Sequence, residues 1–142
     1  MLVRLLYASR AVATTSAAML DGILEQSRQN NPAQGITGLL CVSGDVFIQL
    51  LEGGRDEVCE LYNAIARDDR HQQVRLLSYQ EIAERNFGAW TMGQVNIANI
   101  NPALLLKYFR RAELNPFDCS GQATMALLHE LVATASIVNR GG

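Results

Sequence analysis

One short segment, Val46 to Leu51, constrains the fold more than any other part of the chain, because the strand it would form is apolar on both faces. Successive side chains of a strand point to opposite faces, so Phe47, Gln49 and Leu51 would share one face, and the other would be entirely aliphatic. Such a composition is typical of an interior strand that is covered on both faces. The segment is therefore predicted to lie inside a sheet, with Gln49 as a buried amide.

Polar side chains also interrupt the apolar stripe of a helix predicted over residues 17–30. At the 3.6-residue period this stripe contains Leu20, Ile23, Leu24, Ser27 and Asn31. A buried amide or hydroxyl without a partner costs about 1–3 kcal/mol. Ser27 and Asn31 are therefore expected either to meet backbone groups or to hydrogen-bond a ligand beneath the helix, and a ligand with polar edges is the sharper interpretation.

The composition favours one soluble domain and excludes some classes of partner. A chain of 142 residues with 49% apolar content can bury a substantial core. A net charge of −2 and a pI near 5.6 lack the basic surface that nucleic acid requires. No apolar run approaches the roughly 20 residues that cross a bilayer, and the N-terminus has no signal-peptide pattern. We expect a cytoplasmic protein that binds neither nucleic acid nor membrane.

The cysteines and histidines do not form a motif. Cys41, Cys59 and Cys119 are odd in number and lack CxxC spacing, so we expect them to be reduced and structural. His71 and His129 are too far apart to form a helical metal pair, and neither has a cysteine nearby. No metal site is predicted.

Residue periodicity predicts seven elements before residue 98. Strands are expected over residues 3–9, 36–42, 46–51, 74–82 and 92–97, and helices over 17–30 and 56–67. One of residues 14–16 would cap the first helix, and Pro32 and Gly35 would end it. Gly53 and Gly54 would end the third strand.

The resulting β-α-β-β-α-β-β order predicts an α+β fold, the ferredoxin-like split βαβ with one added strand. In that topology the first and third strands are central neighbours. Val3, Leu5 and Tyr7 share a face of the first strand. Tyr7 would therefore lie beside Gln49, and the two side chains can hydrogen-bond if both face the helices.

After residue 98 the composition changes to helix formers, which predicts a domain over residues 1–98 and a helical extension over 99–142 packed on the sheet. Asn101 would cap a helix that starts at Pro102 and runs to about Arg111, and Ser120 would cap a longer one to about Ile137. The residues expected to cover the second, apolar sheet face are Met125, Leu128, Leu131, Val132 and Ala135.

Two apolar residues of the last predicted helix, Leu127 and Ile137, lie off its main stripe. They predict more apolar surface than one sheet face needs, which favours a homo-oligomer or a contact with a partner protein.

Several separated motifs resemble the BLUF domains, which are blue-light receptors that use flavin. The resemblance covers about residues 2–98. Its motifs are Leu6-Tyr7-Ala8-Ser9, Asn30-Asn31-Pro32, Gly35-Ile36-Thr37-Gly38-Leu39-Leu40, Phe47-Ile48-Gln49, Leu51-Glu52-Gly53, Asp68-Asp69-Arg70-His71 and Phe87-Gly88-Ala89-Trp90-Thr91-Met92. Their joint order and spacing are highly specific. Leu106-Lys107-Tyr108 and the last helix are also similar to the short, single-domain members of the PixD type.

The resemblance implies a role for each residue of the motifs. A flavin, FAD or else FMN or riboflavin, would lie between the two helices and the sheet. Tyr7 would donate an electron and a proton, and Gln49 would switch hydrogen bonds between the phenol and the N5/C4=O edge of the ring. The residues implied to contact the flavin are Tyr7, Ile23, Ser27, Asn30, Asn31, Gln49, Ile65, Arg70 and His71.

The resemblance also implies how the signal leaves the site. Trp90 and Met92 match the pair whose exchange near the glutamine is implicated in passing the signal on, and either could lie beside Gln49 in the dark. The protein would be a photoreceptor and not an enzyme. Its output would be read by a separate effector protein or through assembly.

A different class of function remains open at this level, because ferredoxin-like folds also serve other functions. A hydrolase would need an anion cradle, and Ala8-Ser9-Arg10 has too little glycine for one. A cofactor-free regulatory or protein-interaction module is the better alternative. The colour of the purified protein distinguishes it from a flavin receptor.

Overall fold

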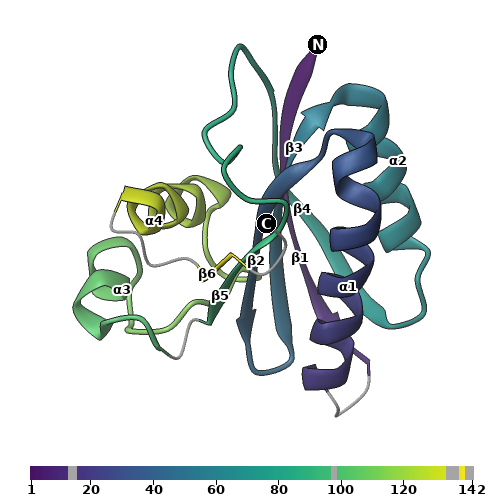
Figure 1. The fold of residues 1–142 in the computed structure, drawn as a ribbon. Helices are drawn as coiled ribbons and strands as arrows, with labels where there is room; N and C mark the ends of the chain where they lie inside the picture. The colour runs from purple at the N-terminus through teal and green to yellow at the C-terminus, as the bar shows by residue number, and fades with distance from the viewer. Residues whose placement is uncertain (13–15, 97–98, 134–137, 140–142) are drawn as a thin grey trace.

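The strands form one mixed sheet whose order differs from the order along the chain (Figure 1). A computed structural model describes residues 1–12, 16–96, 99–133 and 138–139. Within these ranges the elements are β1 (Leu2–Ala11), α1 (Ser16–Gln34), β2 (Thr37–Ser43), β3 (Val46–Gly54), α2 (Arg55–Ala66), β4 (His71–Ile82), β5 (Gly93–Asn96), α3 (Pro102–Tyr108), α4 (Gly121–Ala133) and β6 (Val138–Asn139).

The sheet order is β4-β1-β3-β2-β5-β6. β3 lies between β1 and β2 and is antiparallel to both, while β5 is parallel to β2. The predicted ferredoxin-like α+β fold is confirmed, including an interior position for the segment Val46 to Leu51. The register pairs Tyr7 of β1 with Gln49 of β3, as the strand periodicity predicts.

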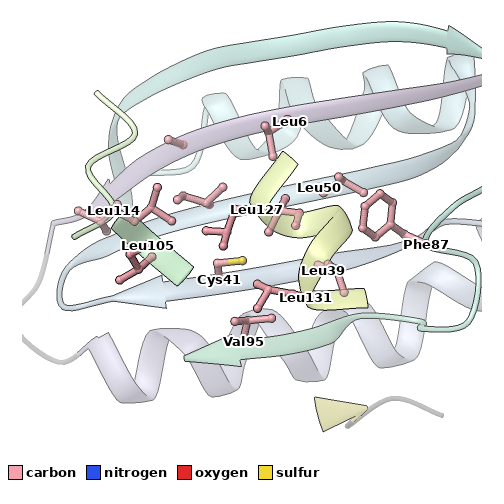
Figure 2. Packing of buried hydrophobic residues seen from close by; sticks show 14 residues of the cluster. Leu6, Leu39, Cys41, Leu50, Phe87, Val95, Leu105, Leu114, Leu127 and Leu131 are labelled. Atoms are coloured by element: carbon pink, nitrogen blue, oxygen red, sulfur yellow. The ribbon is translucent and has the colours of Figure 1, made fainter. Parts of the chain in front are cut away.

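Helices cover both faces of this sheet, α1 and α2 on one and α3 and α4 on the other (Figure 1). Alternation along the strands divides the core accordingly. Tyr7, Phe47 and Leu51 belong to a cluster with Leu24 of α1 and Val58 of α2. The opposite cluster joins sheet residues to the C-terminal helices (Figure 2), and its labelled members are Leu6, Leu39, Cys41, Leu50, Phe87, Val95, Leu105, Leu114, Leu127 and Leu131.

The first helix passes Pro32 and continues to Gln34, so of the two residues predicted to end it, Gly35 does and Pro32 does not. Gly35 then adopts a positive φ of 68°. The N–H of Gly35 donates to the carbonyl of Pro32 at 3.3 Å, and the N–H of Ile36 donates to that of Asn31 at 3.0 Å. These bonds form a Schellman motif, which satisfies the last carbonyls of the helix and fixes Asn31 in its final turn.

The third strand also runs past its predicted end. Gly53 and Gly54 remain in β3, paired with Val3 and Leu2 of β1, because β1 is long enough to continue the ladder. Gly54 is then the N-cap of α2.

Capping in the C-terminal region is confirmed at both helix starts. The side chain of Asn101 accepts from the N–H of Ala103, with Pro102 in the first turn, and the hydroxyl of Ser120 accepts from the N–H of Ala123 at 3.0 Å. The first of these helices stops at Tyr108 and not near Arg111, and residues 134–137, in which the longer helix was predicted to end, lie outside the described residues.

The prediction that Leu127 lies on excess apolar surface is wrong. Its side chain has 0% exposure and is part of the core shared with the sheet. Helix α4 packs in a layer that also contains α3 and the segment after it, so residues off its main stripe are covered as well (Figure 2). Ile137 lies outside the described residues.

Among the described helices, none has the length and apolar character to cross a bilayer.

Candidate functional site

A cavity of about 470 Å³ lies between α1, α2 and the sheet face that carries Tyr7 and Gln49. A volume of this size is typical of sites that hold small molecules. All the residues predicted to contact a cofactor line it: Tyr7, Ile23, Ser27, Asn30, Asn31, Gln49, Ile65, Arg70 and His71.

The floor of the cavity contains a buried phenol–amide pair. Tyr7 and Gln49 are 1% and 2% exposed, and the Tyr7 hydroxyl donates to Oε1 of Gln49. Burial, and to a lesser degree the nearby Tyr62 and Asp68, raises the pKa of the Tyr7 phenol. The phenol therefore keeps its proton and acts as a hydrogen-bond donor in the resting site.

The other end of the Gln49 amide faces a methionine. Nε2 of Gln49 lies 3.5 Å from Sδ of Met92, which is 1% exposed. Trp90 is half-buried and packs against the opposite core cluster. Of the two residues that the sequence left open, Met92 is thus the one beside Gln49.

Helix α1 contributes polar groups from its last two turns. Asn31 is 2% exposed and Ser27 is 8% exposed, and both line the cavity. Nδ2 of Asn31 donates to the carbonyl of Thr91 at 3.2 Å, which links the helix to the residue before Met92. Asn30 lines the cavity from a solvent-exposed position at its rim.

The opposite end of the cavity carries charge. Arg70 is exposed and forms a fork with the Asp68 carboxylate, whose shortest contact joins Nη2 to Oδ2 at 2.6 Å. Hydrogen bonds from Arg70 lower the pKa of Asp68 to about 2. Nδ1 of His71 lies 2.9 Å from the hydroxyl of Ser9.

Sequence reasoning missed part of the lining, although the signal for it was present. Gln26 and Gln34 follow the same helical spacing as Ile23, Ser27, Asn30 and Asn31 along α1. The same spacing along α2 and past its end adds Glu57, Glu60, Leu61, Ala64 and Asp68 to Ile65. Gln26 lies within the α1 stripe and Gln34 one turn past its end, whereas the added residues of α2 and the segment after it extend from Ile65 in both directions.

Two half-buried histidines, His71 and His129, predict how stability depends on pH. Burial lowers the pKa of His71 and of His129 below 6.5. The unfolded chain therefore binds more protons just below that pH, and the free energy of unfolding should fall as the pH drops from about 7 to 5. The Asp68 contribution is lost only at lower pH, as the pH falls from its ordinary pKa of 3.8 to about 2.

Urea titrations at pH 7.5 and 5.5 measure this effect. The double variant H71Q/H129Q should lose most of the difference between the two pH values. Equal or greater stability at the lower pH would contradict the conclusion that the folded state lowers the pKa values of these histidines.

Taken together, these features define a ferredoxin-like domain whose cavity suits a small molecule with apolar faces and a polar edge. No group of three or more His, Cys, Asp or Glu side chains among the described residues is arranged to hold a metal ion. Residues 2–93 match the family described as BLUF, sensors of blue-light using FAD, and the chain belongs to this family. The family match decides for a flavin-based sensor of blue light and against the cofactor-free module.

Solved structures of short BLUF proteins resemble this chain over nearly its full length. The dark-state structure of BlrB has 34% sequence identity and a TM-score of 0.79, and covers 94% of this chain and 96% of that one. The photo-activated state of BlsA has 30% identity and a TM-score of 0.80, covering 93% and 95%.

In two larger relatives the similarity covers less than two thirds of this chain. The photoactivated adenylate cyclase subunit beta of Euglena gracilis is 35% identical over 92 residues, which are 64% of this chain and 11% of that protein. The blue light- and temperature-regulated antirepressor BluF of Escherichia coli (strain K12) is 31% identical over 88 residues, 62% of this chain and 22% of that protein. This chain therefore spans only a small part of each.

Proposed function

We propose that this chain senses blue light through a switch made of Tyr7 and Gln49, with non-covalently bound FAD as its cofactor. The single observation that carries the proposal is the buried Gln49 amide, which accepts from the Tyr7 phenol at one end and lies 3.5 Å from the Met92 sulfur at the other. An amide presents an acceptor and a donor on one planar group, so turning it over reverses its hydrogen bonds.

The residues around the cavity fit a flavin. Ile23, Leu61 and Ile65 supply apolar walls from the two helices, and Asn31, Ser27 and Gln49 supply amide and hydroxyl groups that match polar ring edges. Arg70 and His71 are proposed to serve the carbonyl on the other side of the ring. Bound flavin supplies the absorption of blue light and, when excited, a strong oxidant.

The proposed switch depends on the side-chain chemistry of both Tyr7 and Gln49. Tyr7 could give an electron to an excited flavin and its hydroxyl proton to the Oε1 that it already contacts, and would recover both before the red-shifted state is reached, which phenylalanine cannot do. Gln49 can then rotate or tautomerise, and its new hydrogen bonds are strong because the site is buried. Rearrangement of Gln49 would disturb its contact with Met92.

We further propose that the output of residues 1–98 passes to the C-terminal extension, residues 99–142, and changes association with a second copy or with an effector protein, without turnover by this chain. Trp90 supports this route, since it packs against the same cluster as Leu105, Leu127 and Leu131 of the C-terminal helices. Size-exclusion chromatography with light scattering in darkness and under blue light tests it, and identical masses and partners in both would contradict it.

Absorption spectra before and after blue light test the proposed function directly. We expect a yellow protein whose flavin bands shift reversibly to longer wavelength, and FAD in chromatography of the extracted flavin. Bleaching of the flavin band would contradict the proposed switch, because it would indicate an adduct or net reduction. A colourless protein that cannot be reconstituted would contradict flavin binding by this chain.

Asn31→Ala should weaken flavin binding. Removing one partner of a buried hydrogen bond costs about 1–3 kcal/mol, which corresponds to a rise in Kd of about 5- to 140-fold. Fluorescence titration of the apoprotein with flavin measures the change. Gln29→Ala is the matched control, because Gln29 is an exposed amide on the same helix whose side chain donates to Glu25 and does not line the cavity. Equal affinities for both variants would exclude Asn31 from the site.

A further inference from the structure

The segment between β4 and β5, residues 83–92, carries both Trp90 and Met92 but contains no helix or strand. Met92 at its end lies against Gln49, and Phe87 near its middle is 0% exposed. Backbone N–H groups beside the buried points of such an irregular segment need hydrogen-bond partners from elsewhere in the fold.

Glu52 provides two of these partners. Its carboxylate is 0% exposed and lies three residues after Gln49 on β3, on the opposite face of the strand. Oε1 accepts from the N–H of Phe87 at 2.7 Å, and Oε2 accepts from the N–H of Asn86 at 3.1 Å. Oε2 also accepts from Nε of Arg4 at 2.7 Å, so the buried charge is paired.

Arg85 holds the start of the same segment. Its Nη1 donates to the hydroxyl of Thr37 at 2.9 Å and to the backbone carbonyl of Glu52 at 3.1 Å. Its Nη2 donates to the carbonyl of Gly35 at 2.7 Å. One guanidinium thereby ties the segment to the end of α1, to β2 and to β3.

The segment touches the flavin-side residues at one end and the C-terminal helices in its middle. The carbonyl of Thr91 accepts from Asn31, and the carbonyl of Trp90 accepts from the N–H of Gly38 at 3.1 Å. The ring of Phe87 lies 5.1 Å from the ring of His129 on α4. Glu52 and Arg85 therefore hold residues 85–87, the part of the segment that contacts α4 and leads to Met92.

We propose that Glu52 is a positioning residue of the switch, whose buried carboxylate, together with Arg85, holds residues 85–92 so that Met92 lies against Gln49. The inference rests on the proposed function, since it assigns a role within that switch. A carboxylate has two acceptor oxygens for its three donors, whereas glutamine has one oxygen and an NH₂ group that would face a donor. Glu52→Gln thus keeps the size of the side chain and removes part of the anchor.

Two readouts test the anchor without relying on stability. Trp90 is the single tryptophan of the chain, so incorporation of 5-fluorotryptophan gives one ¹⁹F resonance from the segment. In Glu52→Gln holoprotein we expect a shifted or doubled ¹⁹F resonance in darkness. We also expect at least threefold slower dark recovery of the red-shifted state, because the anchor favours the arrangement in which Met92 contacts Gln49.

Val3→Ala is the matched control for lost stability, because Val3 is 0% exposed on β1, does not line the cavity and belongs to the core cluster on the sheet face opposite the one that Trp90 packs against. It should lower the midpoint of thermal unfolding and leave both readouts unchanged. If Glu52→Gln does not fold, Arg85→Gln takes its place in both measurements. Arg85 is only half-buried, so this substitution should leave the fold intact, and both readouts should change in the direction expected for Glu52→Gln.

An unshifted single resonance together with unchanged or faster recovery in these variants would overturn the proposal. Failure of the proposed function would look different. The unsubstituted protein would then show no red shift, while the ¹⁹F comparison in darkness would still report whether Glu52 positions the segment.

Discussion

Gln49→Leu is expected to retain flavin and to lose the light-induced red shift completely. Leucine nearly preserves the packing of a side chain that is 2% exposed, so the cavity should keep its shape. It cannot accept from the Tyr7 phenol or donate toward Met92, and it has no second orientation with different hydrogen bonds. Difference spectra of the holoprotein after blue light measure the loss.

Gln80→Leu, an exposed substitution of the same kind on β4, should keep the full red shift. Tyr7→Phe should lose it, whereas Tyr62→Phe should not, although the two tyrosine rings lie only 5.6 Å apart. A normal photocycle in Gln49→Leu would refute the proposed switch. Loss of the red shift in Tyr62→Phe but not in Tyr7→Phe would instead identify Tyr62 on α2 as the electron and proton donor.

The sequence predicts the centre of this site well, because that centre depends on local periodicity. Alternation in two interior strands and the ferredoxin-like order suffice to pair Tyr7 with Gln49. Helical spacing likewise places Ser27 and Asn31 over the same sheet face.

Element ends and the packing of the last helix depend on contacts that periodicity does not contain. Pro32 and Gly35 were expected to end α1, and only Gly35 does so, because its positive φ closes the helix with Pro32 still inside it. Leu127 lies off the stripe of α4 and is buried all the same, because the C-terminal layer covers more than one side of that helix.

The anchor of the β4–β5 segment could not be predicted for the same reason. Glu52 lies in a motif that resembles the BLUF family, yet its carboxylate meets N–H groups 34 and 35 residues away in sequence. Arg85 reaches a carbonyl 50 residues away. The sequence around Glu52 and Arg85 does not indicate whether these side chains bond to distant backbone groups or to solvent.

We expect Gly38→Ala to lower the free energy of unfolding more than any other addition of a single methyl group in the sheet. Gly38 lies in β2 opposite Leu51 of β3, and a Cβ at this position would lie 1.9 Å from the Leu50 carbonyl oxygen and 2.9 Å from its carbon. Both are backbone atoms of an interior strand, so neither can turn aside as a side chain would. Overpacking of this kind costs about 3 kcal/mol or more, which lowers the unfolding midpoint by about 10 °C for a chain of this size.

Gly22→Ala is the matched control, because it makes the same chemical change in α1, where the nearest atom to the new Cβ is Nη1 of Arg70 at 3.7 Å. Alanine is the better helix former, so this variant should be as stable as the unsubstituted protein or more stable by up to about 1 kcal/mol. Thermal and urea unfolding of both variants give the comparison. Since the N–H of Gly38 also donates to the carbonyl of Trp90, displacement of β2 should reach the segment that carries Met92. Equal unfolding midpoints for the two variants would show that β2 and β3 do not approach as closely as this structure places them.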